Sequence, residues 1–128
     1  VESGFDADAI SKTNDYGLMQ INAVNHKWLR EHFGEAWRPL DAKDNLRAGI
    51  YVLAGYVGKY EDTHKALMAY NMGEGGARKQ WRKGVYTSKY SRKIVEKMEA
   101  YTEYVESVTS FRVDVPVCDA GGSLARSD

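Results

Sequence analysis

The sequence predicts a mainly α-helical domain that begins with a loop-rich segment. The chain has 128 residues, which is enough for one domain with a core that needs no disulfide. Apolar residues recur at helical spacing over most of residues 22–108, which predicts helices that pack on one another. Residues 1–21 are instead rich in Gly, Asp, Asn and Ser, which favour turns, and "DYGLMQIN" predicts a short β-hairpin near residues 10–22.

The first expected helix has recognisable boundary signals, and the second has a clear apolar stripe. Asn22 is a suitable N-cap for a helix that runs to about residue 32, and Gly34 follows as a stop signal. A second helix is expected over residues 43–60. Its apolar stripe at helical spacing consists of Leu46, Ile50, Leu53, Ala54 and Val57.

Three more helices are expected further along the chain. The third covers residues 63–72 and ends at the glycine-rich "GEGG", and a short fourth covers residues 76–83. The fifth is long, over residues 88–108. Its stripe consists of Tyr90, Ile94, Met98, Tyr101 and Val105.

The tail differs in composition from the helices. "FRVDVPV", residues 111–117, alternates apolar and polar residues and predicts a strand, which Pro116 restricts to a sheet edge. "CDAGGSLARSD" is small and polar, so we expect residues 118–128 to be disordered. The chain is therefore expected to consist of a folded domain over residues 1–110 and a tail over residues 111–128.

Charge and composition argue against several classes of protein. Eighteen basic and 18 acidic residues give a formal net charge of zero, which does not favour nucleic acid. No apolar run approaches the ~20 residues of a membrane-spanning helix. Cys118 is the only cysteine, and His26, His32 and His64 have no metal-like spacing. We therefore expect no nucleic-acid partner, no membrane span in this chain, no metal and no cofactor.

Several polar residues at helix ends and in loops are candidates for a binding site, because such positions often hold functional groups on a rigid scaffold. They are Glu2, Gln20, Asn22, Tyr70 and Asn71. Taken singly, each also has a structural interpretation. Glu2 could be a solvated terminal charge, Gln20 and Asn22 turn and cap residues, and Asn71 a helix C-cap.

The motifs "VESGFDADAIS", "DYGLMQIN" and "ALMAYNMG" resemble, in order and approximate spacing, those of the soluble, Slt-type lytic transglycosylases. The similarity extends over residues 1–98, and "KDNLRAGIYVLAGY" is similar to the helix between the second and third motifs. The resemblance implies a lysozyme-like helical fold for the domain over residues 1–110. Within this family, the chain most resembles small enzymes that open the cell wall for secretion, conjugation or pilus machines, and it is also similar to phage-borne relatives.

The resemblance implies cleavage of the β-1,4 bond between N-acetylmuramic acid and N-acetylglucosamine in peptidoglycan. That bond breaks when a carboxylic acid protonates the leaving oxygen, which near neutral pH requires burial to raise the pKa of the acid. By resemblance this acid is Glu2, which then takes a proton from the C6 hydroxyl to give a 1,6-anhydro end. The implied substrate contacts and orienting residues are Ser3, Met19, Gln20, Tyr70, Asn71 and Tyr90. Met19 could equally be a core residue.

A second resemblance concerns "DYGLMQIN", which is similar to a stretch of c-type lysozymes that holds their second catalytic carboxylate. Asp15 stands at that place here, so a muramidase that uses Glu2, Asp15 and water is the alternative enzyme. Carboxylates ~5 Å apart suit retaining hydrolysis and ~6.5–9.5 Å an inverting route. Asp15 could instead be a turn residue that is hydrogen-bonded to its own loop. A wall-binding or assembly module that has lost turnover is the non-enzymatic alternative.

The resemblance also bears on location and completeness. Its substrate implies a chain that acts outside the cytoplasm, in the periplasm, in the wall, as a secreted protein or on a virion. The family has a helix before the catalytic Glu, whereas Glu2 stands at the start of this chain and would be solvated without such a helix. We expect upstream sequence to supply it, or the late segment with "TEYVES" to fold back. Residues 78–97 hold eight basic side chains and one acidic one, which indicates either a rim for the peptide stems or a solvated face.

Overall fold

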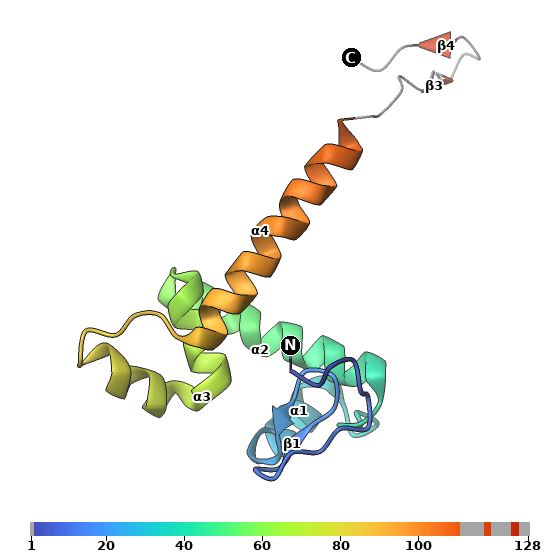
Figure 1. Cartoon of the computed structure of the whole chain (residues 1–128). Helices are drawn as coiled ribbons and strands as arrows, with labels where there is room; N and C mark the ends of the chain where they lie inside the picture. The colour runs from blue at the N-terminus through green and yellow to red at the C-terminus, as the bar shows by residue number, and fades with distance from the viewer. Residues whose placement is uncertain (1, 111–116, 119–123, 126–128) are drawn as a thin grey trace. The chain divides into compact units, whose positions relative to one another are not determined.

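The loop-rich start and the helical remainder are both present in the computed structural model, which describes residues 2–110, 117–118 and 124–125 (Figure 1). The prediction of a mainly α fold with a short β-hairpin is confirmed. The chain divides into two compact units, residues 1–94 and 95–128. The first unit contains β1 (Asp15–Tyr16), β2 (Ile21–Asn22), the 3-10 helix η1 (Ala23–Asn25), α1 (His26–Phe33), α2 (Ala42–Tyr60), α3 (Thr63–Trp81) and the start of α4 (Lys89–Thr109).

The hairpin forms within the segment expected for it. Strands β1 and β2 pair antiparallel, with Asp15 opposite Asn22 and Tyr16 opposite Ile21. The turn between them needs positive φ at two places, +74° at Gly17 and +49° at Gln20. Glycine adopts such angles at little cost, which explains the Gly-Leu-Met-Gln turn.

Capping residues define the start of η1, the end of α1 and both ends of α2. The Asn22 side chain accepts a hydrogen bond from the Val24 N–H and caps η1, which leads into α1, and Gly34 with φ of +104° ends α1. Helix α2 starts at its N-cap Asp41, whose side chain accepts from the Asp44 N–H at 2.9 Å. It ends at Glu61 in the left-handed conformation.

The buried face of α2 differs from the apolar stripe seen in the sequence. Asn45, Ala48 and Gly49 are the buried residues of this helix. Leu46 and Ile50, which belong to the stripe, remain 44% and 56% exposed. Small residues and one amide therefore form the face on which the hairpin packs, and helical spacing alone does not identify that face.

Helix α3 corresponds to the third and fourth expected helices. It runs as one element to Trp81 but is interrupted at Gly73, where φ is 75° and ψ is 156°. The expected end of the third helix at residue 72 coincides with this kink. The Asp62 side chain accepts from the Lys65 N–H at 2.8 Å and caps the helix start.

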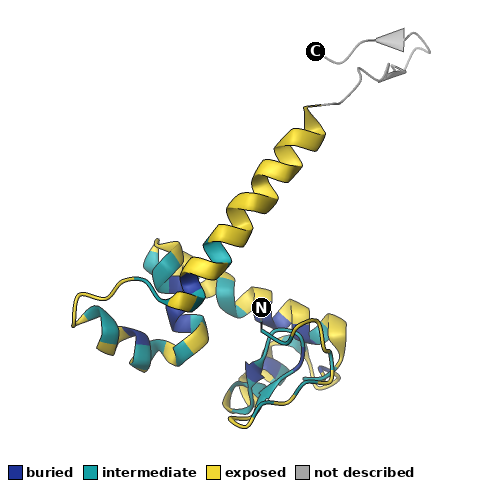
Figure 2. Ribbon diagram, in the orientation of Figure 1, coloured by how far each residue is buried: buried dark blue, intermediate teal, exposed yellow. Residues whose placement is uncertain are grey.

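Two apolar clusters support the first unit (Figure 2). Ile21, Leu29, Trp37 and Ala48 bring together β2, α1 and α2. The second cluster consists of Met68, Ala69 and Ala77 of α3, with Tyr56, Tyr60, Met72 and Trp81 packed against it. The groove described below is lined by residues adjacent to both clusters.

From Glu96 to its end, α4 is exposed along its whole length, including the apolar Met98, Tyr101 and Val105 of the expected stripe (Figure 2). In the described part of the tail, β3 (Val117–Cys118) pairs antiparallel with β4 (Leu124–Ala125). Residues 111–116 of the expected strand and most of the segment expected to be disordered lie outside the described residues. Among the helices that the structure describes, none has the length and apolar character needed to span a membrane.

Candidate functional site

A groove of about 570 Å³ in the first unit brings together residues from the three sequence motifs. Six of the candidate residues line it: the five that the resemblance implies as site residues, Glu2, Asp15, Gln20, Tyr70 and Asn71, and also Asn22. Ser3, Met19 and Tyr90 do not line it, although each contacts a residue that does or the turn beside it. One groove therefore collects side chains from the start of the chain, the hairpin and α3.

Glu2 is half-buried and accepts a hydrogen bond on Oε1 from the Tyr90 hydroxyl. The expectation that Glu2 would be solvated without a preceding helix is therefore wrong for this carboxylate. Burial, then the hydrogen bond to Glu2 and its charge, raise the pKa of Tyr90 well above the ordinary value. The phenol consequently stays protonated and can donate to the carboxylate throughout the neutral range.

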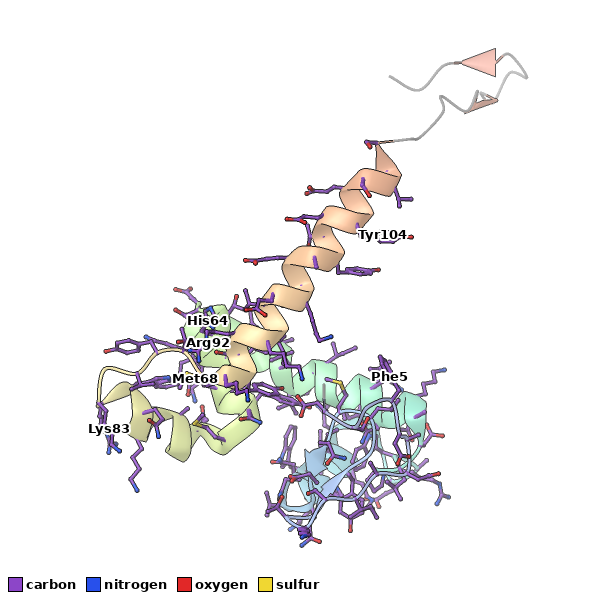
Figure 3. All side chains as sticks on the ribbon, in the orientation of Figure 1. Phe5, His64, Met68, Lys83, Arg92 and Tyr104 are labelled. Atoms are coloured by element: carbon purple, nitrogen blue, oxygen red, sulfur yellow. The ribbon has the colours of Figure 1, made fainter. Side chains whose placement is uncertain are left out.

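Tyr90 is held by the capped start of α4. The Ser91 N–H donates to Ser88 Oγ at 3.1 Å, and the Ser88 N–H donates to Ser91 Oγ at 2.9 Å. Ser91 is fully buried, and its hydroxyl also lies 2.9 Å from His64 Nδ1. Figure 3 labels His64 on α3 and Arg92, the residue after Ser91, on α4. These contacts fix the first turn of α4 on α3, and with it the phenol that reaches Glu2.

Asp15 is a carboxylate bound by its own loop. Oδ2 accepts from Ser11 Oγ at 2.7 Å and from the Thr13 hydroxyl, and Oδ1 accepts from Asn22 Nδ2 at 2.9 Å. Burial alone would raise the pKa of Asp15, but the hydrogen bonds from Thr13, Ser11 and Asn22 outweigh it and lower the pKa. Asp15 is thus an anion that both closes the hairpin and faces the groove.

Ser3 and Gln20 hold the backbone around the groove. The Ser3 hydroxyl donates to the Leu18 carbonyl at 3.1 Å and so ties the segment after Glu2 to the hairpin turn. Gln20 Nε2 donates to the Gly17 carbonyl at 2.9 Å and to the Ala9 carbonyl at 3.2 Å, while the residue lines the groove. The Gln20 amide therefore already has a role in keeping its own turn closed.

Tyr70 and Asn71 form the α3 side of the groove, directly before the kink at Gly73. The Tyr70 hydroxyl donates to the Met19 carbonyl at 2.7 Å. Burial first, then the charges of Glu2 and Asp15, raise the pKa of Tyr70, so it remains a neutral donor. Asn71 is exposed, which leaves its amide accessible from the groove.

The structure places the Met19 side chain against the core and not among the residues that line the groove. It packs on the cluster of Ile21, Leu29, Trp37 and Ala48. An added Cβ at Gly49 would lie 2.5 Å from Met19 Cβ, so this side chain fills the space that a glycine leaves on α2. Of the two interpretations of Met19, the contacts match the core residue.

Sequence reasoning missed several residues that line the groove, including Thr13, Val52 and Tyr56. Asn45, Gly49, Val52 and Tyr56 recur at helical spacing on α2, so this second stripe, which mixes an amide and a glycine with two larger side chains, would have been the signal. Among the described residues, no three His, Cys, Asp or Glu side chains gather closely enough to hold a metal ion.

A comparison with known protein families gives a match over most of the chain. The family model described as "Transglycosylase SLT domain" matches residues 1–94, which include every residue of the groove. No curated protein matches the chain, and no solved structure matches it.

Proposed function

Because the chain belongs to the transglycosylase SLT family, whose activity is cleavage of the glycan strands of peptidoglycan, we propose that Glu2 is its general acid and base. The bond cut is the β-1,4 linkage between N-acetylmuramic acid and N-acetylglucosamine. The observation that carries the proposal is the groove itself, in which half-buried Glu2 accepts a hydrogen bond from Tyr90 and faces Tyr70 and Asn71.

In the first step, the Glu2 carboxylic acid donates its proton to the oxygen that leaves with N-acetylglucosamine. The bond between this oxygen and C1 of N-acetylmuramic acid breaks, and positive charge develops on that sugar ring. The acetamido oxygen of the same sugar shields C1, so no nucleophile from the protein is needed. Glu2 is left as a carboxylate, which the neutral Tyr90 phenol stabilises by donating to Oε1.

In the second step, the Glu2 carboxylate takes the proton of the C6 hydroxyl. The freed O6 forms a bond to C1 and closes a 1,6-anhydro ring, and Glu2 returns to its protonated form. The reaction consumes no water. The residues proposed to hold the sugars are Gln20, Tyr70 and Asn71, whose amides and phenol suit acetamido and hydroxyl groups, while Ser3 and Tyr90 orient the segment that bears Glu2.

A hydrolytic muramidase is the second candidate, and Asp15 favours it. This residue lines the same groove, and its hydrogen bonds keep it ionised. An ionised carboxylate in a polar, partly solvated setting can stabilise the sugar cation while water attacks. The same hydrogen bonds equally serve the hairpin, so the role of Asp15 has to be tested on the reaction products.

Mass spectrometry of muropeptides released from purified sacculi separates these candidates. A lytic transglycosylase gives 1,6-anhydro ends, which are lighter than the reducing ends of a muramidase product by one water. Glu2→Gln should abolish release while binding to glycan strands persists. Equal release by wild type and Glu2→Gln would exclude Glu2 as the acid, and wild-type binding without release would favour a wall-binding module.

Asp15→Asn is the matched variant for the hydrolytic candidate. We expect anhydro products to persist at about the wild-type rate per folded molecule, since the proposed chemistry uses one carboxylate. A loss of release as complete as that of Glu2→Gln would favour the muramidase. Glu2→Asp is a control that keeps the carboxyl group but shortens the side chain by one methylene group.

The substrate also bears on the place of action. Peptidoglycan lies outside the cytoplasm, and we propose that the chain acts there, whether in the periplasm, in the wall, after secretion or on a virion. A partner in a secretion, conjugation or phage assembly machine stays a prediction from the resemblance.

A further inference from the structure

We propose that Asn45 of α2 is the positioning residue that sets the hairpin side of the groove, an inference that rests on the proposed function. Asn45 is fully buried although its side chain is polar. Its amide makes three hydrogen bonds of 2.7 Å, one on Oδ1 and two from Nδ2. Both N–H groups and the oxygen of the buried Asn45 amide are therefore hydrogen-bonded. A buried polar side chain that is satisfied in this way stabilises one arrangement of the backbone around it.

Two of these hydrogen bonds span the hairpin turn. Asn45 Nδ2 donates to the Tyr16 carbonyl, and Oδ1 accepts from the Met19 N–H, both at 2.7 Å. The side-chain amide thus pairs with the strand residue before the turn and with the third residue of the turn in the way that a peptide group would. The third hydrogen bond, to the Pro39 carbonyl, ties the same amide to the loop before α2. The three hydrogen bonds therefore fix the distance between the hairpin turn and α2.

The fit between the turn and α2 leaves no room for a shift. A Cβ at Gly17 would lie 2.5 Å from Asn45 Nδ2 and 3.1 Å from the Pro39 carbonyl oxygen. One helical turn further along α2, a Cβ at Gly49 would lie 2.5 Å from Met19 Cβ. Asn45 and Gly49 are thus complementary to Gly17 and Met19, so the backbone of the turn contacts the helix directly.

Met19 connects the turn to the other side of the groove. Its N–H donates to Asn45, and its carbonyl accepts from the Tyr70 hydroxyl of α3 at 2.7 Å. Gln20 follows Met19, and Asp15 precedes the turn, and both line the groove with Tyr70. Asn45 therefore fixes the spacing between the two sides of the groove without lining it.

The test is Asn45→Asp, which keeps shape and the acceptor for Met19 but replaces the two donors with an oxygen that faces two carbonyl groups. With soluble glycan strands at a temperature where the variant is folded by circular dichroism, we expect kcat to fall about 10- to 100-fold. Small displacements of groups that hold a substrate have effects of that size. KM should change less than kcat.

Met68→Ala is the matched control, because Met68 is also fully buried but belongs to the α3 cluster, which contains no residue of the hairpin turn. It should lower the melting temperature by a comparable amount and leave kcat within about twofold of wild type. Equal losses of kcat in both variants, or an unchanged kcat in folded Asn45→Asp, would overturn the proposal.

Amide hydrogen exchange of the wild type covers the case in which Asn45→Asp does not fold. The Met19 N–H, bound to buried Asn45, should exchange at least about 100-fold more slowly than the Asp8 N–H, which donates to exposed Asp6. Exchange of both amides at similar rates would overturn the proposal. The activity of Glu2→Gln separates the proposed function from the role of Asn45. Turnover by Glu2→Gln would refute the proposed function. If Glu2→Gln is inactive and Asn45→Asp keeps the wild-type kcat, only the role of Asn45 is refuted.

Discussion

The two sides of the groove are stabilised by different physical means. The hairpin side, around Asp15 and Gln20, contains two strands of two residues each and depends on hydrogen bonds between side chains and backbone. The α3 side, at Tyr70 and Asn71, belongs to a helix with its own backbone hydrogen bonds. Met68 and Ala69 of that helix lie in the cluster on which Tyr56 and Tyr60 of α2 pack.

This difference teaches which kinds of change each side tolerates. A helix keeps its shape when a core side chain is shortened, because its backbone ladder persists and only burial is lost. A turn held by individual polar contacts loses its position when one contact is removed or crowded. Substitutions on the hairpin side should therefore alter geometry, and substitutions behind α3 should alter stability.

The largest expected effect is that of Gly17→Ala. The new Cβ would force a left-handed φ of +74° on alanine and would overlap the Asn45 amide. Together these penalties predict a loss of about 3–5 kcal/mol in the free energy of unfolding, measured by urea denaturation. Gly84→Ala is the control, since Gly84 has a similar φ of +76° with no atom within 4 Å of the added Cβ. That variant should lose only about 1 kcal/mol, and equal losses would mean that contact with Asn45 is unimportant.

Met68→Ala should have the next largest effect. Met68 is fully buried in the α3 cluster, so truncation leaves a cavity and costs about 2–4 kcal/mol in the free energy of unfolding. Calorimetry measures this as a lower Tm. Chemical shifts of the hairpin amides, such as that of Met19, should stay at their wild-type values, whereas widespread shifts there would show that the two sides are not independent.

The sequence predicts the local features of this fold well. The end of α1 at Gly34 and the break in α3 at Gly73 follow from glycine, which acts within a few residues. The hairpin follows from "DYGLMQIN" for the same reason. Motif resemblance added the residues of the groove, and the structure places five of them along it.

What the sequence does not reveal depends on contacts between distant residues. Asn45 binds Met19 and Tyr16 across 26 and 29 positions, and nothing near Asn45 in the sequence marks it as a partner of the turn. Periodicity selected the apolar stripe with Leu46 and Ile50, yet the hairpin packs on the face with Asn45 and Gly49. A search for apolar periodicity finds hydrophobic residues, whereas the contact between the hairpin turn and α2 depends on the small size of Gly49 and on the hydrogen-bonded amide of Asn45.

Asp15→Asn should have a smaller effect that depends on pH. Because the folded state lowers the pKa of Asp15 below its ordinary value of 3.8, its carboxylate stabilises the fold above pH 3.8. That stability is lost as the pH falls through the lower, folded-state pKa. The variant should be about 1 kcal/mol less stable than wild type at pH 7. The difference should shrink below pH 3.8, as urea denaturation over a pH series can measure. A constant difference at all pH values would contradict a role for the ionised form.

Tyr60→Phe tests the α3 side at a polar contact and should have the smallest effect. The Tyr60 hydroxyl donates to Glu74 Oε1 at 2.5 Å, and the same oxygen pairs with Lys59, but Glu74 is partly exposed. Loss of one hydrogen bond near solvent predicts about 0.5 kcal/mol in the free energy of unfolding. Hydrogen bonds from Lys59 and then Tyr60 lower the pKa of Glu74, so this contribution is present above 4.5 and fades as the pH falls through the folded-state pKa. Tyr86→Phe, at an exposed residue, is the control. A loss as large as that of Met68→Ala would contradict the view that apolar burial, more than polar contact, stabilises this side of the groove.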